Sequence, residues 1–393
     1  MKANKRRLRL AKRSAKRVAR RVVRRVVGRV VKQGRRTAWK EGRAAGYERG
    51  YHYGRCEAVR ARTVQPEPGN RLELKVLFIP QGFQALDHGI AGGLESRVRE
   101  LVVGTPERMA ELAAEHRPDV MIVLNGLHVF PTDHLEQVDR VRGLGIRTVI
   151  WFADDPYFTN YTADIALRYD MVITHEQSCV PFYEQAGCPQ VRYLPLAADT
   201  GLFRPMPVPP DYRSDICFIG MAFWNRVAFF DRLAPYLQGK RVFIGGGLWE
   251  RMSNYRMVRR FVRSGWIPVE ESVLYYSGAK LVINLHRGPD HETDNRNALR
   301  IPAMSVNPRT YEISACGTLQ LTDMRQDLPR YYTPGVDLDV FGSPEELIAK
   351  IDYYLKHEDI RRTIAFNGLR RTMTEHSFVS RIGQLLGLLG YET

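Results

Sequence analysis

The feature that most constrains the fold is a repeated alternation of short, wholly apolar segments with longer segments of helical periodicity. Apolar runs that end near a glycine or a polar residue occur four times in the first half, at residues 72–82, 118–126, 146–156 and 169–176. Segments with apolar residues at helical spacing lie between them, at 94–116 and 132–145. Continuous apolar strands that alternate with helices are typical of a parallel sheet covered on both faces. The sequence therefore predicts an α/β domain with a doubly wound sheet over residues 72–205.

The same alternation begins again after a proline-rich stretch near residues 205–212. Apolar runs at 216–222, 240–247, 281–286 and 318–323 predict a second doubly wound domain over residues 212–375. A last helical segment (376–393) is expected to pack back on the first domain. Two such domains in tandem place a cleft between the carboxyl ends of two sheets, which is where open α/β folds bind ligands.

Residues 1–64 differ in composition from the rest of the 393-residue chain. Residues 1–62 contain 23 Lys and Arg but three Glu, whereas the remainder contains 36 basic and 40 acidic residues. Valines at helical spacing in "RVARRVVRRVVGRVV" predict a basic amphipathic helix. Because each basic residue near an anionic bilayer contributes about 1 kcal/mol, residues 1–40 are expected to bind an anionic membrane surface or another polyanion. A solvated tail and an organelle transit peptide are the alternatives, and nucleic acid is not an expected partner because no recognition fold accompanies the charge.

The rest of this extension carries a glycine at every fourth position, at Gly42, Gly46, Gly50 and Gly54. Small residues at this spacing allow two helices to approach closely, so residues 42–54 are a candidate for self-association; a flexible segment is the alternative. The residues "QPEPGN" predict a linker at 65–71. Five scattered cysteines without metal-ligand spacing indicate a reducing compartment, and no apolar run has the length of a membrane span.

Strand ends in the second domain carry residues suited to an anionic ligand. In "FIGMAFWNR", Gly220 ends a strand, and Asn225 and Arg226 begin a helix, where backbone N–H groups and a guanidinium attract phosphate. Trp266 is a candidate for stacking on a base, and His286 ends another strand at the cleft. Each of these residues also has a purely structural interpretation, as a turn, a solvated cation or a core side chain.

The first domain offers a different set of polar strand ends. Gly92 and Gly93 stand in what the sequence predicts to be a loop before a helix, where the backbone can approach a phosphate or an acceptor. Asp154 and Asp155 follow an apolar strand, and His175 follows the next one. Carboxylates and an imidazole at such an edge suit a general base or the binding of sugar hydroxyls.

The segment "NPRTYEISACGTLQLTD" (307–323) reads as a short buried helix that leads into a strand, yet it carries Arg309 and Glu312 at its start. Together with "WFADDP", "YLPLAAD", "FIG…R" and "EHSFVSRIGQLL", it resembles the GT-B glycosyltransferases, and among them the spore-maturation CgeB-type group. The resemblance covers roughly residues 72–385 and leaves the basic extension outside. It implies two Rossmann-like domains, with an acceptor on the first and a nucleotide-sugar donor, expected to be UDP-linked, on the second.

The resemblance also implies residue roles. Glu312 matches the glutamate that binds the ribose hydroxyls of the donor, Arg226 and Arg309 would neutralise the diphosphate, and Trp266 would line the base. The expected donor site is completed by Asn225, Gly220, Asn307, Tyr311 and His286.

One position departs from the pattern, because families that retain configuration carry a second glutamate where this chain has Met304. If the enzyme inverts configuration, it needs a base, for which Asp155 is the first candidate and Asp154 and His175 are the next. No metal and no cofactor other than the nucleotide sugar are expected.

The acceptor remains open between a polysaccharide, a lipid-linked molecule and a protein. The alternatives are a nucleotide-sugar epimerase of the same fold and a non-catalytic, polyanion-binding structural protein. The expected location is the cytoplasm, with the extension on the inner face of a membrane or on a spore surface.

Overall fold

The computed structural model describes residues 32–33, 36–40, 42–44, 46–63 and 71–391. It divides the chain into two compact units, residues 1–54 and residues 55–393. In the first unit, residues 36–40, 42–44 and 46–54 are helical and mostly exposed. The expected basic helix over 18–31 and the linker around 65–70 lie outside the described residues.

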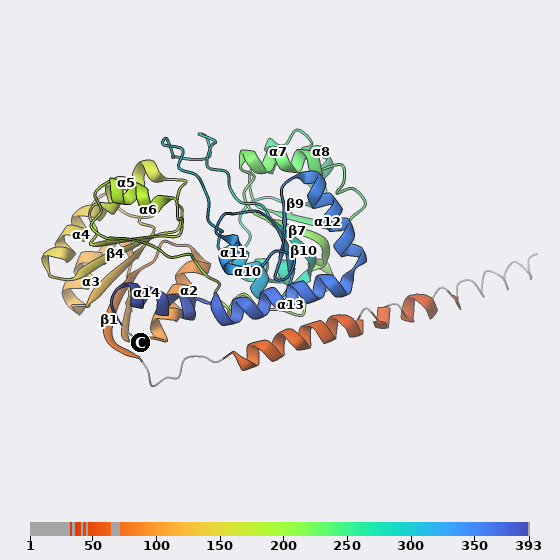
Figure 1. Cartoon of the computed structure of the whole chain (residues 1–393), viewed down its shortest axis with the longest axis horizontal. Coiled ribbons are helices and arrows are strands. Elements are labelled where there is room, and N and C mark those ends of the chain that lie inside the picture. The colour runs from red at the N-terminus through yellow and green to blue at the C-terminus, as the bar shows by residue number, and fades with distance from the viewer. Residues whose placement is uncertain (1–31, 34–35, 41, 45, 64–70, 392–393) are drawn as a thin grey trace, which may run out of the picture. The chain divides into compact units, whose positions relative to one another are not determined.

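The second unit contains two parallel sheets of six strands each, as the apolar runs predicted (Figure 1). The first sheet has the order β2-β1-β3-β4-β5-β6, and its strands are β1 (Leu72–Ile79), β2 (Val98–Val103), β3 (Val120–Leu124), β4 (Arg147–Phe152), β5 (Met171–Thr174) and β6 (Val191–Tyr193). Its helices are α2 (Gln84–Glu95), α3 (Met109–His116), α4 (His134–Gly143), α5 (Thr159–Ala166) and α6 (Cys179–Gln185).

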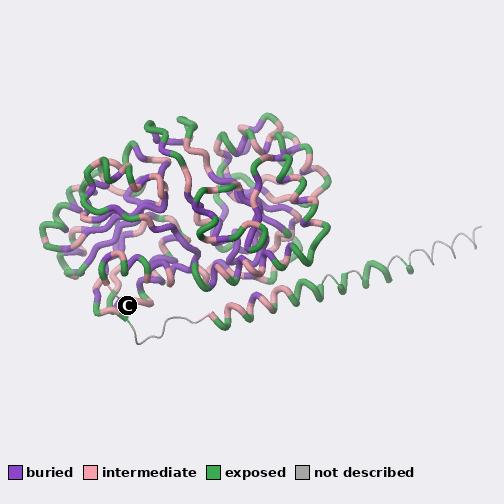
Figure 2. Tube along the Cα trace, in the orientation of Figure 1, coloured by how far each residue is buried: buried purple, intermediate pink, exposed green. Residues whose placement is uncertain are grey.

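The second sheet has the order β12-β11-β10-β7-β8-β9. Its strands are β7 (Ser214–Ile219), β8 (Val242–Gly245), β9 (Val262–Arg263), β10 (Ala279–Asn284), β11 (Leu319–Asp323) and β12 (Asp339–Phe341). Its helices are α7 (Trp224–Leu233), α8 (Tyr255–Val258), α9 (Val269–Gly278), α10 (Arg309–Ala315), α11 (Leu328–Tyr331), α12 (Pro344–Lys356) and α13 (Glu358–Glu375). Figure 2 shows the strands of both sheets as buried segments between more exposed helices. We refer to the two α/β parts as the first half and the second half of this unit.

One predicted element is wrong. Residues 94–116 do not form a single helix, because Val98–Val103 forms the edge strand β2, which pairs in parallel with β1. The helical periodicity of the surrounding sequence concealed a strand whose partner is distant in sequence.

The last helix, α14 (Phe378–Leu388), belongs to the core of the first half (Figure 1). Phe378, Ile382 and Leu385 are buried there against α2 and the sheet. The segment that returns to the first half runs beside the segment that leaves it. Phe378 N–H donates to Ala198 O at 3.0 Å, and Ala198 N–H donates to His376 O at 3.0 Å. At the start of the same unit, Cys56 lies fully buried in the core of the second half.

Candidate active site

A pocket of about 600 Å³ lies at the carboxyl ends of both sheets. Its walls come from the segments that follow β1, β4 and β5 in the first half and β7, β8 and β10 in the second, together with the start of α10. In each sheet the strand order reverses at neighbouring strands, β1 and β3 in the first and β7 and β10 in the second. Such switch points leave a crevice beyond the strand ends, so this is the place where the topology predicts a ligand.

The second half provides positive charge to the pocket. Arg226, on α7, is 2% exposed and donates from Nε to Leu285 O and from Nη1 to Met221 O, both at 2.9 Å. Burial, followed by the charge of Arg309, lowers the pKa of Arg226 to about 9. Among the described residues, neither Arg226 nor Arg309 has an ion-pair partner, although both line the pocket. Two guanidinium groups without a direct ion-pair contact in the described part of the chain favour an anionic ligand.

Arg287 adds a third cation; the sequence places it at a strand end that faces the cleft but assigns it no role in the site. It follows β10, lines the pocket, and lies over the rings of Phe223 and Tyr157 at 4.3 and 4.4 Å from their centroids. Burial lowers its pKa from the ordinary arginine value. Its position directly after the predicted strand end at His286 was the available signal.

Glu312 lies on α10 and lines the pocket with 9% exposure. No described residue donates a hydrogen bond to its carboxylate. Burial raises the pKa of Glu312 to about 7, and the charge of Arg309 opposes that rise. A buried carboxylate that lacks a protein donor has its acceptor sites available for hydroxyl groups of a ligand.

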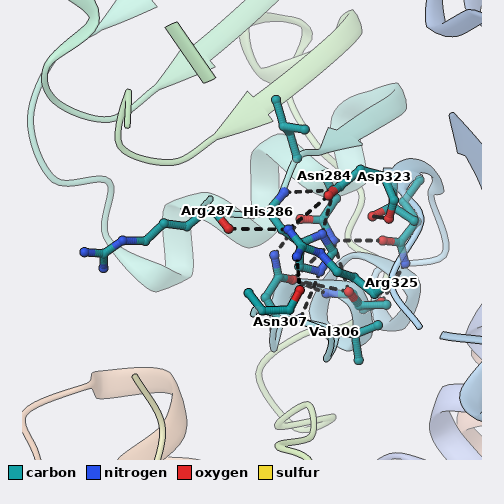
Figure 3. Close-up of polar contacts among 12 residues, drawn as sticks. Asn284, His286, Arg287, Val306, Asn307, Asp323 and Arg325 are labelled. Carbon is teal, nitrogen blue, oxygen red and sulfur yellow. Dashed lines mark hydrogen bonds and ion pairs between the residues drawn. The ribbon is translucent and has the colours of Figure 1, made fainter. Parts of the chain in front are cut away.

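The turn before α10 is fixed by a hydrogen-bond network around His286 and Asn307 (Figure 3). Asn307 Oδ1 accepts from Thr310 N–H at 3.1 Å, and Asn307 Nδ2 donates to Asn284 Oδ1 at 3.0 Å. His286 Nε2 accepts from Asn307 N–H at 3.0 Å, so the Nδ1–H group donates to Asp323 Oδ1 at 2.6 Å. Both ring nitrogens of His286 are therefore occupied within the protein, and the residue positions Asn307 instead of lining the pocket.

Two further residues expected in the donor site lie away from the pocket. Tyr311 is fully buried in the core among Tyr331, Tyr332 and His376, because it lies on the side of α10 opposite the cleft. Asn225 donates from Nδ2 to His286 O at 2.8 Å and is not one of the lining residues.

Glycines form the wall opposite α10. Gly220, which was predicted, lines the pocket, and so do Gly246 and Gly247 of the triple glycine, which the sequence analysis had not placed in the site. A Cβ atom on Gly246 would lie 2.2 Å from Gly220 O, so glycine is required for these loops to approach each other. Trp266 borders the same wall and is 76% exposed, which leaves its ring available to a planar ligand.

In the first half, adjacent strand-end residues differ in where they face. Asp154 lines the pocket and accepts from Asn125 Nδ2 at 2.9 Å. Asp155 is 1% exposed and accepts from Thr174 Oγ1 at 2.6 Å and from Tyr183 Oη at 2.8 Å. Burial raises the pKa of Asp155 to about 7, but its carboxylate is held inside the first half and is not among the pocket-lining groups, so it is poorly placed to be a base.

His175 lines the pocket beside Asp154. Its Nε2 is 2.9 Å from Asp155 O, and because a carbonyl only accepts, Nε2 carries the proton. Nδ1 has no partner among the described residues. Burial lowers the pKa of His175, against the charges of Glu176 and Asp154, so the ring is neutral near pH 7 and Nδ1 can accept a proton.

Gly92 and Gly93 are not part of a phosphate loop. Both lie inside α2, and a Cβ atom on Gly93 would lie 2.7 Å from Ile382 of α14. The pocket is lined instead by the start of α2, Phe83 to Leu86. Gly93 therefore serves close packing between α2 and α14, a role that sequence pattern alone did not distinguish from that of a ligand loop.

Comparison with known proteins agrees with this geometry. Residues 226–387 match a family model described as "Glycosyl transferase-like". The chain is 27% identical to the spore protein CgeB of Bacillus subtilis (strain 168) over 314 residues, which cover 78% of this chain and 95% of that protein.

Among solved structures, HepE of Anabaena in complex with UDP and glucose is similar with a TM-score of 0.54 and 14% identity, over 81% of this chain and 99% of that one. Sucrose-phosphate synthase of Thermosynechococcus elongatus is similar with a TM-score of 0.51 and 13% identity, over 80% and 99%. Residues 226–387 therefore match the glycosyl transferase-like family model, on a chain that has the GT-B fold.

Proposed function

We propose that this glycosyltransferase moves a sugar from a UDP-linked donor, bound by the second half, to an acceptor bound by the first half. The observation that carries the proposal is the pairing of two uncompensated guanidinium groups, Arg226 and Arg309, with the unpartnered carboxylate of Glu312 on one pocket wall. A diphosphate and a ribose present the complementary groups, two anionic phosphates and two adjacent hydroxyls. The similar HepE structure was solved with UDP and glucose.

Each residue then has a defined role. Arg226 and Arg309, joined by Arg287, would neutralise the charge that develops on the diphosphate leaving group, and Glu312 would accept hydrogen bonds from the ribose. Trp266 would stack on the base. No group of three or more His, Cys, Asp or Glu among the described residues is placed to hold a metal, and the arginines support a reaction without a bound metal; activity that survives dialysis against EDTA is the expected result.

The binding test uses UDP. Glu312→Ala should weaken UDP affinity about ten- to hundredfold, since loss of a charged hydrogen bond costs ~1.5–3 kcal/mol. Glu358→Ala, which changes an exposed glutamate on α13 remote from the pocket lining, is the matched control and should bind UDP as the wild type does. Unchanged UDP affinity in Glu312→Ala would remove the ribose assignment.

The turnover test separates the two enzyme candidates. Incubation with UDP-sugars and candidate acceptors should release UDP and produce a glycosylated acceptor. Conversion of the UDP-sugar to an epimer without UDP release would identify an epimerase, and UDP binding without turnover across donors and acceptors would identify a non-catalytic protein.

The N-terminal extension is proposed to bring the enzyme to an anionic membrane face or another polyanion. In the helical part of the first unit, Trp39 and Tyr47 are 64% and 71% exposed, and Arg43 lies over the Trp39 ring at 5.6 Å. At 100° per residue these three fall within 80° of one another, a mixture of aromatic and basic groups that suits a lipid headgroup layer. No helix in the described part of the chain is long and apolar enough to cross a bilayer. Binding to vesicles should rise with anionic lipid and fall with salt; equal binding to neutral vesicles would contradict it.

Self-association through residues 42–54 is a second proposal for the extension. Gly42, Gly46, Gly50 and Gly54 recur at every fourth position, so no side chain at these positions hinders a close approach between two copies of the helix. Sedimentation of the full chain and of a Gly46→Leu, Gly50→Leu variant should differ in mass if a dimer forms there.

A further inference from the structure

The long loop between β10 and α10, residues 285–308, hydrogen-bonds to the first half of the unit at two places. Near its middle, Arg296 N–H donates to Tyr157 O at 2.7 Å, and Asn160 N–H donates to Arg296 O at 2.9 Å. Near its end, the loop meets Glu176, which follows β5. The residues that come directly after this second contact are those of the proposed donor site, beginning with Asn307.

The carboxylate of Glu176 accepts hydrogen bonds from both halves. Oε1 accepts from Ser178 N–H at 3.1 Å and Ser178 Oγ at 2.9 Å in the first half, and from Ser305 Oγ at 3.3 Å in the second. Oε2 accepts from the backbone N–H groups of Met304 at 3.0 Å and Ser305 at 2.9 Å, both in the second half. Glu176 is 1% exposed, so these bonds are shielded from water, and hydrogen bonds to an ionised carboxylate are about twice as strong as neutral ones.

The hydrogen bonds of Glu176 connect segments that line the pocket from the two halves. His175 and Glu176 line the pocket from the first half, whereas Arg309 and Glu312 line it four to eight residues after the bonded amides. A shift of residues 304–305 would therefore be passed along the chain to the groups proposed to hold the donor. Met304 takes part through its backbone, so the position at which related families carry a glutamate is met here by a carboxylate from the opposite half.

We propose that Glu176 is a positioning residue for donor binding, which holds residues 304–305 against the first half and so sets the place of Arg309 and Glu312 relative to His175. The inference rests on the proposed function for the identity of the donor. The bonds themselves are independent of that identity.

The test compares Glu176→Gln with Glu184→Gln, which changes an exposed glutamate on α6 of the same half. Glutamine keeps one accepting oxygen, but its NH2 group must face N–H or O–H donors on one side of the contact, so we expect the dissociation constant of UDP and the KM for the UDP-sugar to rise about ten- to hundredfold in Glu176→Gln. Hydrogen exchange should quicken at the amides of Met304 and Ser305 and stay unchanged in β7 and β10. Glu184→Gln should match the wild type in all three measurements.

A purely structural role for Glu176 would lower the melting temperature without changing the UDP affinity of the folded protein, and that result would overturn the proposal. Unchanged exchange at residues 304–305 would overturn it as well. If Glu176→Gln does not fold, Glu176→Asp keeps the charge and withdraws the carboxylate by one methylene; an intermediate loss of UDP affinity supports the proposal, and wild-type affinity contradicts it. If the wild type does not bind UDP, the proposed function fails on its own, and the exchange measurement still decides whether Glu176 holds the loop.

Discussion

At the scale of single residues, ligand binding and stability favour different forms of Glu312. The ionised form suits ligand binding, and the protonated form suits the folded protein. Burial raises its pKa from 4.5 to about 7, so the folded protein keeps a proton on this carboxyl that the unfolded chain releases between those values. Stability from this group is therefore present below about pH 4.5 and is lost as the pH rises through 7. Above pH 7 the group is ionised, which is the form best suited to accept from hydroxyl groups.

This conflict predicts that Glu312→Gln stabilises the protein at high pH. At pH 8 the free energy of unfolding should rise by on the order of 3 kcal/mol, at about 1.4 kcal/mol per unit of pKa shift, and the gain should vanish near pH 4.5. Denaturant titrations at the two pH values measure it. Equal stability of variant and wild type at pH 8 would show that the carboxylate is not destabilised by burial.

His175 lines the pocket, and its Nδ1 is buried and has no partner among the described residues, so we expect it to act on an acceptor that displaces the side chains covering this atom. His175→Ala should lower kcat about 10²–10⁴-fold while UDP affinity stays near that of the wild type, since general-base catalysis contributes that much. In the wild type, activity should fall as the pH drops below the lowered pKa of His175, where the imidazole takes up a proton. Asp155→Asn is the informative comparison. This variant should lower the free energy of unfolding and keep kcat close to that of the wild type. A large loss of kcat without a loss of stability would return the base assignment to Asp155.

These residues show what a strand-end pattern can and cannot predict. The alternation of strands and helices placed Asp154, His175 and Arg226 near carboxyl strand ends, and the resemblance assigned Glu312 to the donor site; all four line the pocket. It could not tell Asp154 from Asp155, because which of two adjacent side chains turns inward depends on donors such as Tyr183 that come from distant segments.

At the scale of elements, the contact between α2 and α14 explains the glycines of α2. A Cβ atom on Gly89 would lie 2.2 Å from a ring atom of Phe378, whereas one on Gly92 would meet no atom within 4 Å. The sequence predicted α14 from its apolar spacing, but the role of these glycines depends on a helix almost 300 positions further on. In the same way, β2 was concealed because its edge position leaves Arg99 and Glu100 exposed, without the apolar continuity of a buried strand.

The two glycines provide a matched pair of substitutions. Gly89→Ala should destabilise the protein by about 1–3 kcal/mol through overpacking against Phe378. Gly92→Ala should stabilise it by about 0.5–1 kcal/mol, because alanine is the better helix former and the site has room. Thermal or chemical unfolding measures both; UDP affinity should not change in Gly92→Ala, and a large loss there would restore the phosphate-loop interpretation.

At the scale of the whole molecule, the first half of the second unit depends on the end of the chain. The first half takes α14 from the far end of the chain, and hydrogen bonds at Ala198 join the two crossing segments. We therefore expect deletion of residues 377–393 to expose the apolar surface of α2 and the first sheet. Limited proteolysis should then cut the first half while the second half resists; resistance of both halves would show that α14 is dispensable.

The position of α14 also has a consequence for synthesis on the ribosome. Arg97 Nε donates to Val379 O across 282 positions of sequence, so the first half cannot complete its core when its own strands emerge. At roughly 5–20 residues per second, the nascent chain waits about 15–55 s with α2 uncovered. The part made first is the part finished last, and that interval is when this protein would most need a chaperone.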